Sequence, residues 1–308
     1  MPYVVSGYMI IGHETSIAKD IAAICRPGLI MKTFLALILT LFFIAPALAG
    51  KDLPASGGER AYTFGIVPHY EARRLFAIWR PILDALQQET GLRFSARIGN
   101  SSAAFEQEVI GGQFDFAYMG PYHQVMSEKS AGYLPLVRDV GANIYGILVV
   151  RKDDPISDVK ELDGKVVALP APNALVAAMM IRADLENKFG IKIVPRYVHT
   201  HDSVYLNVVL GQAAAGGGQQ KTLAEMQPAI RDQLRVLYRT ADVTAHPVSA
   251  HPRVPAAVRK QVQDAFLRLG ETPQGKALLA TIPYKQVGVA NLADYEPIRR
   301  MGLHRFTE

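Results

Sequence analysis

Strand-like and helix-like segments alternate along this chain from about residue 60 onward. The first strand-like run, residues 62–67, stops at Pro68, and apolar residues then recur at helical spacing from Leu75 to Leu86. Repetition of such a unit is typical of α/β folds, in which helices cover a mainly parallel sheet. The pattern therefore predicts an α/β fold with mainly parallel sheets.

The alternation continues through most of the chain. Helices are predicted between the strands, and a last one runs from Val258 to Leu269. Residues 240–255 hold three prolines and no periodicity, so they are expected to form a connection. The predicted strands are residues 62–67, 94–98, 114–119, 134–140, 144–151, 166–169, 194–198, 213–216 and 235–238.

Two crossings of the chain predict two Rossmann-like lobes. One lobe is expected to comprise residues 60–144 plus 245–308, and the other residues 145–244, with a double-crossing hinge near Tyr145 and Val243. Open parallel sheets bind ligands beyond the carboxyl ends of their strands, where the starts of helices present free N–H groups. We therefore expect a cleft between the lobes that suits an anion.

Residues 31–49 have the features of a secretory signal peptide. Lys32 precedes an apolar stretch from Phe34 to Ile44, and Ala47-Leu48-Ala49 is a small-residue cleavage site. The apolar stretch is roughly a dozen residues long, whereas a membrane-spanning helix needs ~20. We predict a leader of residues 1–49 that contains this cleavable signal peptide.

Cysteine content and charge narrow the class of protein. The single cysteine, Cys25, lies in the predicted leader, so the secreted chain has no disulfide and no cysteine for a lipid anchor. This favours a soluble protein of the periplasm. The net charge of +5 favours an anionic partner only weakly, and scattered Lys and Arg residues predict no binding of nucleic acid.

Four stretches of the chain resemble the periplasmic phosphate/phosphite/phosphonate-binding family of ABC-transporter components. They are residues 64–91, 111–125 (GGQFDFAYMGPYHQV), 201–218 and 272–301, and together they span nearly the whole secreted chain. The resemblance implies a type II periplasmic binding protein fold. It also implies that two lobes close on a small oxyanion and deliver it to a membrane permease.

The resemblance implies specific ligand contacts and shows two departures. Tyr118 matches the aromatic residue after a strand, His201 matches a histidine before a second-lobe helix, and Tyr70 lies in the first-strand loop. The family's hydroxyl-rich loop is replaced by residues 169–173 (LPAPN), which removes side-chain donors for an oxyanion. An acid of the family is replaced by Ala214, which removes a partner for the ammonium group of an aminophosphonate.

Polar residues at strand and helix ends complete the candidate site. Tyr118 precedes Gly120-Pro121, where its ring and hydroxyl are expected to face the cleft; the alternative is a buried structural tyrosine. Asn173 either contacts the ligand or caps a helix predicted over residues 174–189, and these two roles are compatible.

His201 and Ser203 lie at the predicted start of another helix. The alternative for His201 is a surface position, with Asp202 as the helix cap. Gln219 follows Gly216–Gly218, a stretch that is expected to come after a short strand and to bring backbone N–H groups close to a ligand. The candidate ligand-binding residues are therefore Tyr70, Tyr118, Asn173, His201, Ser203 and Gln219.

Neither a metal nor a cofactor is expected. The histidines 199, 201, 246 and 251 include no helical pair four residues apart, and no cysteine lies near them. The chain also lacks a Gly-x-Ser-x-Gly elbow, a His-Glu-x-x-His motif and paired carboxylates at strand ends, so no enzyme is predicted.

The sequence thus predicts a monomeric solute-binding protein of the periplasm. It would capture a small phosphate- or phosphonate-like anion between its lobes for an inner-membrane ABC permease. Two alternatives remain open at this point: a receptor of the same fold that signals to a membrane histidine kinase, and a binder of a small organic ligand.

Overall fold

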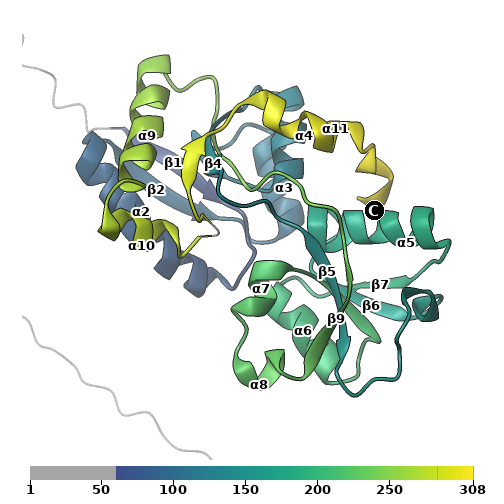
Figure 1. Cartoon of the computed structure of the whole chain (residues 1–308). Helices are drawn as coiled ribbons and strands as arrows, with labels where there is room; N and C mark the ends of the chain where they lie inside the picture. The colour runs from purple at the N-terminus through teal and green to yellow at the C-terminus, as the bar shows by residue number, and fades with distance from the viewer. Residues whose placement is uncertain (1–59, 283, 308) are drawn as a thin grey trace, which may run out of the picture. The chain divides into compact units, whose positions relative to one another are not determined.

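The computed structural model describes residues 60–282 and 284–307, and their strands form two mixed sheets surrounded by helices (Figure 1). The strand order is β11-β4-β10-β3-β1-β2 in the first sheet and β7-β6-β8-β5-β9 in the second. The α/β prediction is confirmed. The predicted leader lies outside the described residues.

The first sheet contains the two ends of the described chain. Its strands are β1 (Ala61–Ile66), β2 (Arg93–Ile98), β3 (Phe116–Tyr118), β4 (Leu134–Asp139), β10 (Val248–Ala250) and β11 (Val287–Val289). The helices that accompany it in the chain are α2 (Ala72–Thr90), α3 (Ser102–Ile110), α4 (Pro121–Ala131), α9 (Ala256–Leu269), α10 (Pro273–Leu279) and α11 (Glu296–Arg300), with short turns η3 (Leu292–Tyr295) and η4 (Leu303–Phe306).

The second sheet is built from the middle of the chain. Its strands are β5 (Gly146–Arg151), β6 (Val166–Leu169), β7 (Val194–Tyr197), β8 (Ala215–Gln219) and β9 (Leu234–Arg239). The helices are α5 (Met180–Phe189), α6 (His201–Val209), α7 (Gln220–Ala224) and α8 (Pro228–Arg231), with a 3₁₀ turn η1 (Val159–Leu162) and a π-helical turn η2 (Leu175–Met179) that leads into α5.

The apolar spacing that predicts α2 is the face that the helix buries. Leu75, Trp79, Ile82 and Leu86 are all inaccessible or nearly so, and the Trp79 ring lies 5.2 Å from that of Phe64 in β1. Helix α2 lies beside α9 and α10 (Figure 1), so three helices cover this part of the first sheet.

Both sheets are mixed, which corrects the expectation of mainly parallel sheets. Strand β10 pairs antiparallel with β3 and β4, and β5 pairs antiparallel with β8 and β9. Strand β10 falls in residues 240–255, which were expected to form only a connection. A strand of three residues is too short to show an alternating pattern.

The two crossings between the sheets run side by side. Ile144 and Val243 form an isolated antiparallel bridge, with N–H···O distances of 2.9 and 2.8 Å. This pairing lies at the two positions where the sequence predicts a hinge. The lobe boundaries themselves stay a prediction, and the C-terminal turn η4 packs against α5, where Arg182 donates to the Phe306 carbonyl.

Glycines in β5 and β8 make room for the π-helical turn η2. A Cβ atom on Gly146 would lie 1.9 Å from the Val176 carbonyl oxygen, and one on Gly217 would lie 2.2 Å from the Ala177 carbonyl oxygen. Gly216–Gly218 are therefore part of a buried strand, and the expectation that they form a loop after it is wrong. The missing side chains of Gly146 and Gly217 let η2 pack directly on the sheet, whereas Gly216 and Gly218 face Val204 and Tyr205 of α6.

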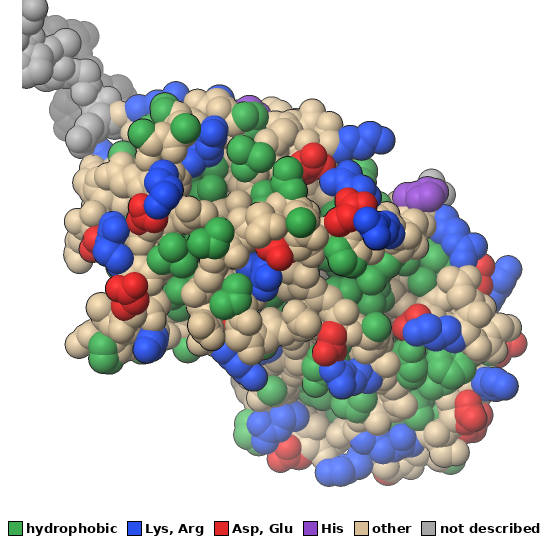
Figure 2. Space-filling view, turned by 45° about the horizontal axis from the view of Figure 1, so that its top comes forward, with side chains coloured by type: hydrophobic (Ala, Val, Ile, Leu, Met, Phe, Trp, Pro, Cys, Tyr) green, Lys and Arg blue, Asp and Glu red, His purple; other side chains and the backbone are tan. Residues whose placement is uncertain are grey.

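Two further observations on the described residues concern membranes and nucleic acid. None of their helices combines the length and apolarity needed to cross a membrane. On the face drawn in Figure 2, Lys and Arg side chains are interspersed with Asp and Glu, so that face carries no continuous basic strip of the kind that binds nucleic acid.

Candidate functional site

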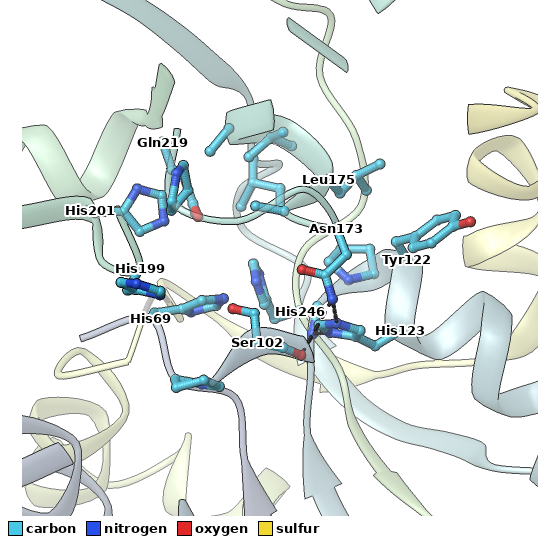
Figure 3. A pocket seen from close by; sticks show the side chains of 18 residues that line it. His69, Ser102, Tyr122, His123, Asn173, Leu175, His199, His201, Gln219 and His246 are labelled. Carbon is cyan, nitrogen blue, oxygen red and sulfur yellow. Dashed lines mark hydrogen bonds between the residues drawn. The ribbon is translucent and has the colours of Figure 1, made fainter. Parts of the chain in front are cut away.

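A small cavity lies where the starts of four helices meet (Figure 3). Ser102 begins α3, Pro121–His123 begin α4, Leu175–Ala177 begin η2, and His201 begins α6. The first N–H groups of a helix have no acceptor within the helix, and the dipole there is positive. Four such ends around one space favour the binding of an anion.

Local sequence fixes where these helices begin. The Ser101 hydroxyl accepts a hydrogen bond from Ala104 N at 3.1 Å and caps α3, while Pro121 occupies the first position of α4. Thr200 caps α6 by accepting from Ser203 N at 3.1 Å. The alternative of an Asp202 cap with His201 on the surface is therefore wrong, because His201 is 4% exposed.

The lining of the cavity contains no Lys, Arg, Asp or Glu side chain, but it contains five histidines. Burial lowers the pKa of His69 to about 4 and that of His201 to about 3. The pKa of His123 is lowered to about 3, and that of His246 is lowered well below its ordinary value, in both cases chiefly by burial. These four imidazoles are therefore uncharged near neutral pH.

Three polar atoms of the lining are buried and have no hydrogen-bond partner among the described residues. They are the Asn173 Oδ1 atom and the Nδ1 atoms of His201 and His246. Buried polar atoms in proteins are nearly always paired. The cavity therefore has hydrogen-bonding capacity that a polar ligand can use.

Three of the predicted site residues line this cavity: Asn173, His201 and Gln219. The expected cap role of Asn173 is wrong, because the helical segment begins as the π-helical turn η2 with Ala174 at its cap position and no side-chain cap bond. Asn173 instead donates to the Glu106 carboxylate of α3 at 2.7 Å. Gln219 ends β8 and faces the space from the second sheet.

Tyr118 lies behind the cavity, in a smaller adjoining space of about 20 Å³. Its ring stacks on that of His246 at 5.5 Å and lies 4.9 Å from that of Trp79. Its buried hydroxyl has no partner among the described residues. His69 and Gln219 line both spaces, so Tyr118 is separated from the main cavity by these side chains.

Tyr70 and Ser203 take part in other contacts. The Tyr70 hydroxyl donates to Glu225 at 2.7 Å, and the Arg74 guanidinium lies 3.8 Å from the Tyr70 ring centre and 3.0 Å from Glu225. These contacts join α2 to the end of α7. Ser203 accepts a hydrogen bond from the hydroxyl of Thr200 and belongs to the cap of α6.

Sequence reasoning missed several lining residues, most clearly His69, Ser102, His123 and His246. The first three could have been found, since His69 follows β1 and the other two lie in the first turns of α3 and α4. His246 precedes the unpredicted β10, so no pattern pointed to it.

A larger space of about 440 Å³ adjoins the cavity. The two share Pro68, Ser102, Pro170 and His199 in their lining. Despite the histidines, no three His, Cys, Asp or Glu side chains within residues 60–282 and 284–307 are placed to hold a metal ion.

Comparisons with known proteins agree on one family. A family model described as "ABC transporter, phosphonate, periplasmic substrate-binding protein" matches residues 64–295. The phosphonates-binding periplasmic protein of Escherichia coli K12 is 21% identical over 263 residues, which cover 80% of this chain and 77% of that protein.

A second curated relative is the phosphate-import protein PhnD of Mycolicibacterium smegmatis, 25% identical over 195 residues that cover 56% of this chain and 60% of that protein. The crystal structure of PhnD1 from Prochlorococcus marinus with methylphosphonate superposes with a TM-score of 0.72 at 16% identity, covering 81% of this chain and 100% of that one. This likeness confirms the type II periplasmic binding protein fold.

Proposed function

Because the chain belongs to the family of periplasmic substrate-binding proteins of phosphonate ABC transporters, we propose that it captures a phosphate- or phosphonate-like anion in the histidine-lined cavity. The family is one of transport proteins, which favours import over the sensory alternative. We infer that the protein binds its ligand without transforming it.

The observation that carries this proposal is the convergence of four helix starts on one cavity. The starts of α3, α4, η2 and α6 supply N–H groups from elements attached to both sheets. An anion in this position gains contacts on both sides at once, which is how a two-lobed binding protein is stabilised in its closed form.

The size and charge of the cavity narrow the ligand class. Its volume of about 40 Å³ accommodates roughly three water-sized groups, which suits a small oxyanion. The lining has no carboxylate to pair with an ammonium group. Phosphate, phosphite and simple alkylphosphonates are therefore favoured over aminoalkylphosphonates. Ala214 precedes β8 at the opposite end of that strand from Gln219, so the acid expected in its place has no bearing on this cavity.

The remaining expectations concern export of the protein and its partners. We propose that the signal peptide at residues 31–49 directs export and is cleaved before Gly50, and that the ligand-loaded monomer docks on an inner-membrane ABC permease. N-terminal sequencing of protein taken from the periplasm tests the cleavage. Size-exclusion chromatography with light scattering tests the monomeric state.

Calorimetric titration of the secreted protein tests the ligand class. Methylphosphonate and phosphate are expected to bind, and an aminoalkylphosphonate is expected to bind more weakly. The variant H201Q should weaken binding, whereas H304Q, at an exposed position, should not. Absence of binding by every phosphorus oxyanion would contradict the proposal.

A further inference from the structure

The amide of Asn173 is held in one orientation by its neighbours. Its Nδ2 atom donates to Glu106 Oε2 at 2.7 Å and lies 3.4 Å from the Ser102 carbonyl oxygen. A flipped amide would place its oxygen against these two oxygen atoms, which repel it. The nitrogen therefore faces α3, and the oxygen is left for the cavity.

His123 lies on the same side of the Asn173 amide as Glu106. The Gly120 N–H donates to His123 Nδ1 at 3.3 Å, so the neutral ring carries its proton on Nε2. That Nε2 lies 3.6 Å from Glu106 Oε2 and 3.3 Å from Asn173 Nδ2. The ring thus closes the space behind the amide, and Figure 3 shows the Asn173 nitrogen turned toward His123 and Ser102 while its oxygen points away from them.

The oxygen of Asn173 is a buried acceptor without a donor. The residue is 5% exposed, and Oδ1 has no partner among the described residues. A fully deprotonated oxyanion offers only acceptor oxygens and meets this atom with repulsion, whereas an oxyanion with one hydroxyl donates to it. The acceptor is therefore matched to a protonated ligand.

We propose that Asn173, positioned by Glu106, selects oxyanions that carry a hydroxyl proton, such as the monoanion of an alkylphosphonate, over anions that have none. This inference rests on the proposed function and specifies the chemical form of its ligand. Sulfate and alkylsulfonates, which carry no proton near neutral pH, are rejected by the same contact.

The titratable groups around the amide are accounted for on each side. Glu106 faces it from α3, and its pKa is raised by burial. His123 faces it from α4, and the other titratable side chains of the lining are Tyr122 and the histidines 69, 199, 201 and 246. The imidazoles of His69, His123, His201 and His246 are uncharged near neutral pH, so the proton that these groups leave to be shared with Asn173 is the ligand's own.

The direct test compares methylphosphonate with methanesulfonate at pH 6. The two anions have the same shape and, when methylphosphonate is singly charged, the same charge, and they differ by one hydroxyl proton. Calorimetry of the secreted protein should give methanesulfonate a Kd about 10- to 100-fold higher. Above the second pKa of methylphosphonate, measured on the free ligand, its Kd should rise about tenfold per pH unit.

The variant E106Q tests the positioning role. A glutamine amide can accept or donate, so it lets the Asn173 amide flip and present N–H groups to the cavity. The preference for methylphosphonate over methanesulfonate should shrink to a few-fold, and the pH profile should flatten. The control E108Q lies on the same helix, where Glu108 pairs with Arg97 at 2.7 Å, and should keep both properties.

The outcomes separate this inference from the proposed function. Equal affinity for the two anions in the unaltered protein, or a constant affinity through the second pKa of methylphosphonate, would overturn the role of Asn173 and leave oxyanion capture intact. A preference that E106Q leaves unchanged would overturn the positioning by Glu106. If neither phosphate nor any phosphonate binds at any pH, both proposals fail.

Discussion

Acidification should destabilise the ligand-free protein through its buried histidines. His123, His201 and His246 are each about 95% inaccessible, and burial holds their pKa values far below the ordinary 6.5. A base whose pKa is lower in the folded state is protonated first in the unfolded state. Its contribution to stability is therefore complete above pH 6.5 and is lost as the pH falls toward the folded pKa.

The size of the effect follows from these pKa values. For an unfolded pKa of about 6.5, each histidine that stays neutral in the folded protein lowers the free energy of unfolding by about 2 kcal/mol when the pH falls from 7 to 5. Three of them cost roughly 6 kcal/mol, a large part of the ~5–15 kcal/mol that stabilises a typical protein. The raised pKa values of Glu106 and Asp202 work in the opposite direction at lower pH.

Urea unfolding at several pH values between 7.5 and 5 measures this loss, and its slope counts the protons taken up on unfolding. The variant H201Q should reduce the slope by about one proton near pH 5. H304Q, at an exposed position, should leave it unchanged. A free energy of unfolding that stays constant between pH 7 and pH 5 would refute the neutral, buried state of these rings.

Three further predictions concern packing and charge. The variant G146A places a Cβ atom 1.9 Å from the Val176 carbonyl oxygen and should lower the free energy of unfolding by about 1–3 kcal/mol, as measured with urea; an unchanged value would contradict the close packing of η2. E225Q removes the carboxylate that joins the end of α7 to α2, so calorimetry should show a several-fold loss of methylphosphonate affinity, and unaltered affinity would exclude a role in closure. D115N replaces the carboxylate of a residue that is 3% exposed and that accepts a hydrogen bond from Arg253 at 2.8 Å. Thermal unfolding should show a free energy of unfolding lower by about 1–3 kcal/mol, and an unchanged value would show that this carboxylate does not stabilise the fold.

The sequence was informative wherever a long apolar period or the end of an element marked a position. The spacing in α2 and the strand-like run of β1 predicted both elements, and their order predicted the α/β class. Asn173 and Gln219 were found from their places beside a predicted helix and a predicted strand, and His201 from the family resemblance together with its place at a helix start. Strand ends and helix starts face the cavity because ligands bind beyond the carboxyl ends of strands in this kind of fold.

Strand β10, the π-helical turn and the position of His246 were not predicted, because hydrophobic periodicity carries no signal for them. Strand β10 has three residues, too few to alternate, so His246 was not placed beside the cavity. The π-helical turn adds one residue per turn without changing the apolar composition of residues 174–189. The glycines of β8 gave no strand signal, because Gly217 admits the backbone of η2 and its two glycine neighbours admit side chains of α6, which come from other parts of the chain.

The most direct test of the account is a crystal structure of the secreted protein with bound methylphosphonate. The account predicts the phosphonate group in the histidine-lined cavity, within hydrogen-bond distance of the N–H groups at the start of η2 and with one oxygen next to Asn173 Oδ1. A ligand bound only in the larger adjoining space, or away from the four helix starts, would contradict it.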